Sequence, residues 1–133
     1  MSMKEELATI IQLLEQDQRY RLDAYRFVRE ALQYAQEIMR MPGESESGSP
    51  RQHLTGQQLC EAIRVYAREQ YGYMAKLVLN NWGIHSTGDI GEIVYNLIRI
   101  KEMRKSKTDK RSDFDDVFDF NDAFEPVFEV SGD

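Results

Sequence analysis

Residues 79–97, LNNWGIHSTGDIGEIVYNL, decide the fold because they hold the end of one helix, a glycine turn and the start of another helix. Two asparagines followed by Gly83 are typical of a helix stop. Ser86 is a typical N-cap residue, and Asp89 lies three positions later, where a capping box has its acidic residue. The apolar residues that follow recur at helical spacing: Ile90, Ile93, Val94, Leu97 and Ile98. We therefore expect the helix after Ser86 to be the central and most buried element.

Apolar residues at helical spacing predict four more helices before this one. They run over residues 4–17, from an N-cap at Asp23 to about Met41, from a capping box at Thr55 and Gln58 to Gly72, and from Tyr73 to Asn81. In the last of these, Met74, Leu77 and Val78 are expected to face inward. Residues 42–53 form a loop, rich in turn-forming residues at its start. The sequence thus predicts an all-α domain of about five helices.

The pattern changes after Lys101, where phenylalanines alternate with acidic residues. We expect Phe114, Phe118 and Phe120 to cover the core, so that this acidic and aromatic segment folds back on the last helix. The helical domain then spans residues 1–120. Residues 121–133 form an acidic C-terminal tail, for which disorder and docking on a partner are both open.

Length and composition fit a single globular domain of 133 residues with one cysteine, Cys60. A lone cysteine excludes an internal disulfide framework and is typical of a reducing compartment. The N-terminus lacks the pattern of a signal peptide, and no apolar run has the roughly twenty residues needed to cross a bilayer. We expect a cytoplasmic protein that does not act on membranes.

The formal charge of −6 is divided unevenly along the chain. Residues 109–133 carry nine acidic and two basic residues, a net charge of −7, whereas residues 1–108 carry a net charge of +1. A basic strip precedes and enters the acidic segment: Arg99, Lys101, Arg104, Lys105, Lys107, Lys110 and Arg111. Such asymmetry indicates that these segments bind a partner or each other.

Four segments together resemble a family of small bacterial proteins of unknown function. They are RYRLDAYRFVREAL at 19–32, RQHLTGQQLCEAIRVYAREQYG at 51–72, WGIHSTGDIGEIVYNLI at 82–98 and SDFDDVFDF at 112–120. The resemblance covers about residues 7–120, and its third segment is the most specific. It implies no activity, substrate or catalytic residue, but it does imply that DFDDVFDF is part of the domain.

The first functional hypothesis is a non-catalytic interaction module that binds a protein partner or a second copy of itself. Its expected binding residues are Arg99, Lys101, Arg104, Lys105, Lys107, Phe124 and Phe128. Aromatic residues set among acidic ones suit docking on a basic, apolar groove. The acidic tail is further expected to lie near the basic strip and to compete with a partner for it.

A second hypothesis is nucleic-acid binding, because NNWGIHS could join two helices as a helix-turn-helix and Gly88–Gly91 matches a bare GxxG. The acidic net charge disfavours it, and so do Asp89 and Glu92 at the start of the expected recognition helix. Only the basic strip supplies the charge that such a function needs.

A third hypothesis is an enzyme with an acid–base site around His85, since Asp89 and Glu92 follow at helical spacing. The alternative is that His85 lies in a turn and packs its ring. The sequence has no zinc-ligand spacing, no phosphate-binding glycine loop after a strand and no serine elbow. We therefore expect neither a cofactor nor a metal.

Overall fold

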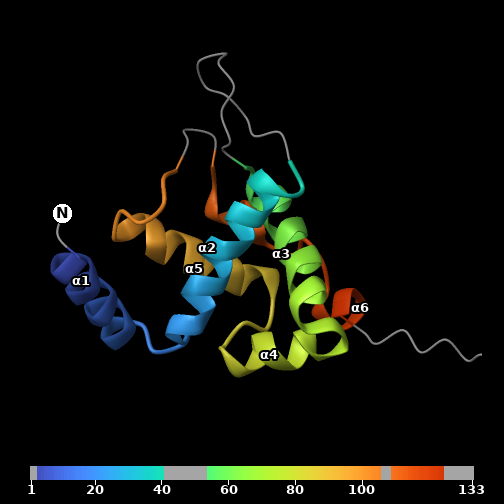
Figure 1. Ribbon diagram of the computed structural model, residues 1–133, viewed down its shortest axis with the longest axis horizontal. Helices are drawn as coiled ribbons and strands as arrows, with labels where there is room; N and C mark the ends of the chain where they lie inside the picture. The colour runs from blue at the N-terminus through green and yellow to red at the C-terminus, as the bar shows by residue number, and fades with distance from the viewer. Residues whose placement is uncertain (1–2, 41–53, 106–108, 125–133) are drawn as a thin grey trace, which may run out of the picture.

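The computed structural model describes residues 3–40, 54–105 and 109–124. These residues form helices and connecting turns without any strand (Figure 1), which confirms the all-α prediction. The elements are α1 (Met3–Gln16), α2 (Leu22–Glu37), α3 (Gly56–Tyr71), η1 (Gly72–Met74), α4 (Ala75–Asn81), α5 (Thr87–Arg99), η2 (Arg111–Phe114) and α6 (Phe120–Phe124), where η marks a 3-10 helix. None of the helices in this part of the chain is both long and apolar enough to pass through a membrane.

Helix α5 lies at the centre of the molecule, as its apolar stripe predicted. It packs against α2, α3 and η2, and Ile90 and Ile93 are fully buried. In Figure 1, α2 and α3 cross near α5, whereas α1 stands apart at one end of the molecule. The core therefore forms around α5, and α1 adds little to it: Leu13 is the only residue of α1 that is buried.

The turn between α4 and α5 is fixed by a close approach to the α1–α2 connection. The Arg21 amide donates a hydrogen bond to the Trp82 carbonyl at 3.1 Å. Gly83 has a φ of +99°, and a Cβ atom there would lie 2.1 Å from the Arg19 carbonyl oxygen. Glycine is needed at this position for both reasons. Ser86 then caps α5 by accepting a hydrogen bond from the Asp89 amide, as predicted.

Two glycines seat η2 on the helical body. A Cβ atom on Gly91 would lie 2.7 Å from Phe114 Cβ, and one on Gly56 would lie 3.1 Å from the Phe114 ring. Phe114 consequently reaches the core, where it is 5% exposed. The predicted return of the DFDDVFDF segment onto α5 is confirmed, and Gly91 of the GxxG sequence has a packing role here.

Two local predictions are wrong. Asp23 does not cap α2: the N-cap is Arg21, without a side-chain hydrogen bond, and Asp23 pairs with Arg26 inside the first turn instead. Helix α2 also ends at Glu37, earlier than expected.

A third error concerns α4, where Met74 and Leu77 are 41% and 61% exposed and do not face inward. Ala75 and Leu79 are buried in their place. The 3-10 turn η1 precedes α4 and shifts the helical phase, which the sequence pattern did not indicate.

Candidate functional site

Four cations of the basic strip form an exposed cluster at the C-terminal end of α5. We call Arg99, Lys101, Arg104 and Lys105 the cationic patch. All four side chains are exposed, and none of them forms an ion pair with another residue in the described part of the chain. Lys101 has a φ of +66°, so the chain turns sharply where α5 ends. Within the described part of the chain, the patch is thus a set of exposed positive charges that forms no ion pairs.

An apolar groove of about 550 Å³ adjoins the patch, between α1, α2 and the end of α5. Its apolar lining includes Leu13, Leu22, Tyr25, Leu97, Ile100 and Met103. Ile100 and Met103, which line the groove, are next to patch residues in the sequence, although no patch residue lines the groove itself. The charged side chains in its lining are Arg26, Arg29, Glu30 and Glu102. Arg29 and Glu102 close one side of it with a salt bridge of 3.2 Å.

Helix α1 carries an uncovered apolar stripe beside this groove. Met3, Leu7 and Ile11 recur every four residues and therefore lie on one face of the helix. They are 84%, 57% and 48% exposed. Large apolar side chains grouped in this way mark surfaces that bind other molecules. We refer to the stripe, the groove and the cationic patch together as the α1–α5 surface.

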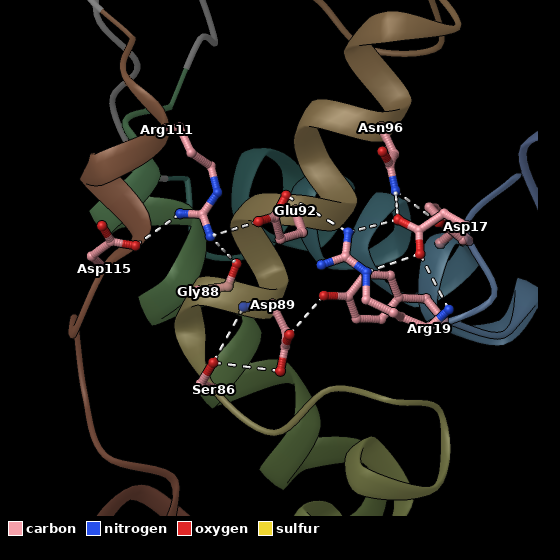
Figure 2. Close-up of polar contacts among 11 residues, drawn as sticks. Asp17, Arg19, Ser86, Gly88, Asp89, Glu92, Asn96, Arg111 and Asp115 are labelled. Carbon is pink, nitrogen blue, oxygen red and sulfur yellow. Dashed lines mark hydrogen bonds and ion pairs between the residues drawn. The ribbon is translucent and has the colours of Figure 1, made fainter.

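A polar network holds the base of α1 in place (Figure 2). The Asp17 carboxylate accepts hydrogen bonds from the Arg19 guanidinium at 2.7 and 2.9 Å and from the Asn96 side chain at 2.9 Å. Asn96 also donates to the Tyr25 hydroxyl at 3.0 Å. Because Asn96 is buried in α5, these contacts fix the α1–α2 connection to the central helix.

The network changes the acidity of its members. The hydrogen bonds from Arg19 hold the pKa of the Asp17 carboxyl well below its ordinary value, although partial burial acts the other way. Burial, aided by a hydrogen bond to Asp89, raises the pKa of the Tyr20 hydroxyl above its ordinary value. The two shifts keep Asp17 ionised and Tyr20 protonated at neutral pH, as expected of groups that stabilise a fold.

The N-terminal part of α5 is held by the second half of the same network. Arg111 donates to the Gly88 carbonyl at 2.7 Å and to Asp115 at 2.9 Å, and it lies 3.4 Å from Glu92 (Figure 2). Glu92 also lies 3.9 Å from Arg19. The sequence grouped Arg111 with the basic strip, but this residue is committed to ion pairs inside the fold.

The residues of the enzyme hypothesis do not form an acid–base pair. Asp89 accepts hydrogen bonds from the Tyr20 hydroxyl at 2.6 Å and from the His85 backbone amide at 2.9 Å. Glu92 is directed to Arg19 and Arg111 (Figure 2). The His85 ring lines a polar hollow of about 750 Å³ beside Asp115 and Asp119, but no carboxylate of the described residues holds it in a hydrogen bond.

Two further reactive-residue types are accounted for within the described residues. Burial raises the pKa of the Cys60 thiol to about 12, so this cysteine is a core residue. Across residues 3–40, 54–105 and 109–124, no three histidine, cysteine, aspartate or glutamate residues come together in a way that could hold a metal ion.

The residues of the nucleic-acid hypothesis are largely buried. The turn before α5 buries Trp82 and Ile84, and α5 itself buries Thr87, Ile90 and Gly91 in its first turns. A recognition helix must lay an exposed face in a groove of the nucleic acid. The first turns of α5 therefore offer little exposed surface for such a contact.

One predicted binding residue is buried in the structure, and two others lie outside the described residues. Phe124 was expected to be available to a partner, yet it is 3% exposed and packs edge-on against Phe118 and Phe120. The short helix α6, which the sequence analysis missed, turns it inward against α3 and α4. Lys107, Phe128 and the loop and tail residues 41–53 and 125–133 lie outside the described residues.

Comparisons with protein-family models, with curated proteins and with solved structures find no match to this chain. The resemblance to a bacterial family therefore stays a prediction. Sequence reasoning identified the cationic patch but missed the groove beside it. The amphipathic pattern of residues 4–17 was visible, but that pattern does not tell whether the apolar face is covered.

Proposed function

We propose that this protein is a non-catalytic interaction module whose α1–α5 surface binds an acidic amphipathic helix of a protein partner. The observation that carries the proposal is the cationic patch, four exposed charges without ion-pair partners among the described residues, which directly neighbours the groove residues Ile100 and Met103 in the sequence. An amphipathic helix places apolar side chains in such a groove and its charges at the rim. Charges next to the groove select the sign of the ligand and accelerate its association.

Four charged groups of the network around α5 support recognition over catalysis. Arg19, Arg111 and Glu92 are bound to one another or to the backbone, and Asp89 serves the α5 cap and Tyr20. Groups committed in this way are not free to transfer protons to a substrate. We place the interaction in the cytoplasm, since the reduced, buried Cys60 is typical of a reducing compartment.

The proposal is tested by titrating the full chain with two synthetic helical peptides of about 18 residues. Both have the same apolar face, and one carries glutamates where the other carries lysines. We expect the glutamate peptide to bind at least tenfold more tightly at low salt, with the difference shrinking as salt rises. Equal affinity for the two peptides would contradict the proposal.

A matched pair of variants locates the binding site. Arg104→Glu reverses an exposed charge of the cationic patch, and Arg68→Glu makes the same change at an exposed position of α3, which does not line the groove. Arg104→Glu should weaken binding of the glutamate peptide about tenfold, and Arg68→Glu should have little effect. Equal effects of the two variants would mean that peptide binding depends only on the net charge of the protein and not on the cationic patch.

A further inference from the structure

We infer that the acidic amphipathic helix bound by the α1–α5 surface is α1 of a second copy of this chain, in a two-fold symmetric dimer. The inference rests on the proposed function and names its partner. A two-fold dimer requires a surface that is complementary to itself. The α1–α5 surface contains both parts of such a contact: an exposed amphipathic helix and a groove next to the cationic patch.

The apolar parts are matched in chemistry. Among the described residues the stripe of Met3, Leu7 and Ile11 is left exposed, and Leu22 in the groove lining is 51% exposed. The apolar side chains in the groove lining are aliphatic apart from Tyr25 and Met103, so a ridge of aliphatic side chains suits this part of it, and the other lining side chains are charged or polar. Leu13 and the Asp17 network hold the C-terminal half of α1, and the helix stands apart at one end of the molecule (Figure 1).

The charges are matched as well. Helix α1 carries one lysine and three glutamates, a net charge of −2. At 100° per residue, Glu6 and Glu15 lie on opposite sides of the apolar stripe, and both are exposed. A helix seated in the groove of another copy thus brings acidic residues to the end of α5, where the four cations neighbour the groove residues Ile100 and Met103 in the sequence.

The size of the contact favours two symmetric seatings over one. A helix of 14 residues is roughly 21 Å long. The area of a single face of such a helix, roughly 10 Å wide, is well below the roughly 800 Å² that each partner buries in a typical stable interface. A two-fold dimer seats two helices at once and adds the contact between them.

Sedimentation equilibrium of the full chain gives the first test. We expect a monomer–dimer equilibrium with a dissociation constant in the micromolar range at low salt, weakened several-fold in high salt. A chain that stays monomeric up to hundreds of micromolar at low salt would overturn the inference.

Two matched substitutions test whether α1 forms the contact. Leu7→Glu and Leu77→Glu replace leucines of similar exposure, 57% and 61%, on α1 and on α4. Leu7→Glu should raise the dimer dissociation constant at least tenfold, and Leu77→Glu should leave it within about twofold. Circular dichroism of both variants checks that the fold is retained. Equal effects, or a larger effect of Leu77→Glu, would overturn the inference.

A charge exchange tests the pairing itself. The variants Glu6→Lys/Glu15→Lys and Lys101→Glu/Arg104→Glu each place like charges across the proposed contact, so each should dimerise more weakly than the original chain. An equimolar mixture of the two variants restores opposite charges at both contacts, and it should form a heterodimer about as tightly as the original chain. A mixture that dimerises no better than the separate variants would overturn the inference.

The failure of this inference can be told from the failure of the proposed function. A monomeric chain that still prefers the glutamate peptide, and loses it in Arg104→Glu, would retain the proposed function and refute the second copy as partner. A chain that neither dimerises nor discriminates between the two peptides would refute both.

Discussion

The two ends of α5 carry charged residues that are used in opposite ways. At the N-terminal end, Glu92 lies between Arg19 and Arg111, and Arg111 also holds the Gly88 carbonyl and Asp115. At the C-terminal end, the cationic patch has no ion-pair partner among the described residues. The first set of charges fastens η2 and the α1–α2 connection to the core, whereas the second set is exposed and unpaired as far as the described residues are concerned.

This difference separates stability from recognition along one helix. Partly buried charges that are paired and hydrogen-bonded are costly to disturb, because removing one leaves its partner unsatisfied. Solvated charges contribute little to stability but act at a distance on a charged ligand. Substitutions at the N-terminal end should therefore change the free energy of unfolding, and those at the C-terminal end should change binding.

The largest expected effect is at Gly91, where η2 seats Phe114 against α5. A methyl group in Gly91→Ala would lie 2.7 Å from Phe114 Cβ and 2.8 Å from an Arg111 nitrogen, so η2 must move. We expect a loss of about 3 kcal/mol in the free energy of unfolding. Gly88→Ala is the matched control, because its nearest neighbour lies at 3.4 Å. It should be neutral or stabilise by up to about 1 kcal/mol in chemical denaturation. Equal effects at the two glycines would refute this role of Gly91.

The comparison is tested directly by truncating one arginine that contacts the N-terminal end of α5 and one at its C-terminal end. Arg111→Ala removes contacts to Gly88, Glu92 and Asp115, and it should cost about 2 kcal/mol in urea denaturation. Arg99→Ala should change the free energy of unfolding by no more than about 0.5 kcal/mol. A comparable loss in Arg99→Ala would show that the patch also stabilises the fold.

Asp17 makes part of this stability depend on pH. Since the pKa of Asp17 is lower in the folded chain than in the unfolded chain, its stabilisation is present above about pH 4 and is lost as the pH falls further. We expect Asp17→Asn to cost about 1 kcal/mol at pH 7, because Asn96 and Arg19 lose their carboxylate partner. The difference between the two proteins should shrink in denaturation series taken from pH 6 down to about pH 3. A difference that stays constant with pH would contradict the role of this carboxylate.

The order of the helices was predictable because local signals mark their ends. Thr55 with Gln58, Gly72, and Ser86 with Asp89 are found where the pattern placed them. The phase of α4 was not predictable, because the 3-10 turn before it depends on tertiary packing. The same holds for Arg111, whose ion pairs join residues far apart in the sequence.

The candidate site was predictable in its charge and not in its shape. The cations after Arg99 are visible as a run in the sequence, but the groove is built by α1, α2 and α5 together. Phe124 was misplaced for a related reason. A phenylalanine among acidic residues is expected to be exposed, whereas α6 turns it inward against Phe118 and Phe120.

The most direct test measures stability and binding on one variant of the cationic patch. For Arg104→Glu we predict a free energy of unfolding within about 0.5 kcal/mol of the original chain, together with an about tenfold weaker affinity for the acidic helical peptide. An unchanged affinity accompanied by a clear loss of stability would contradict the division of roles between the two ends of α5.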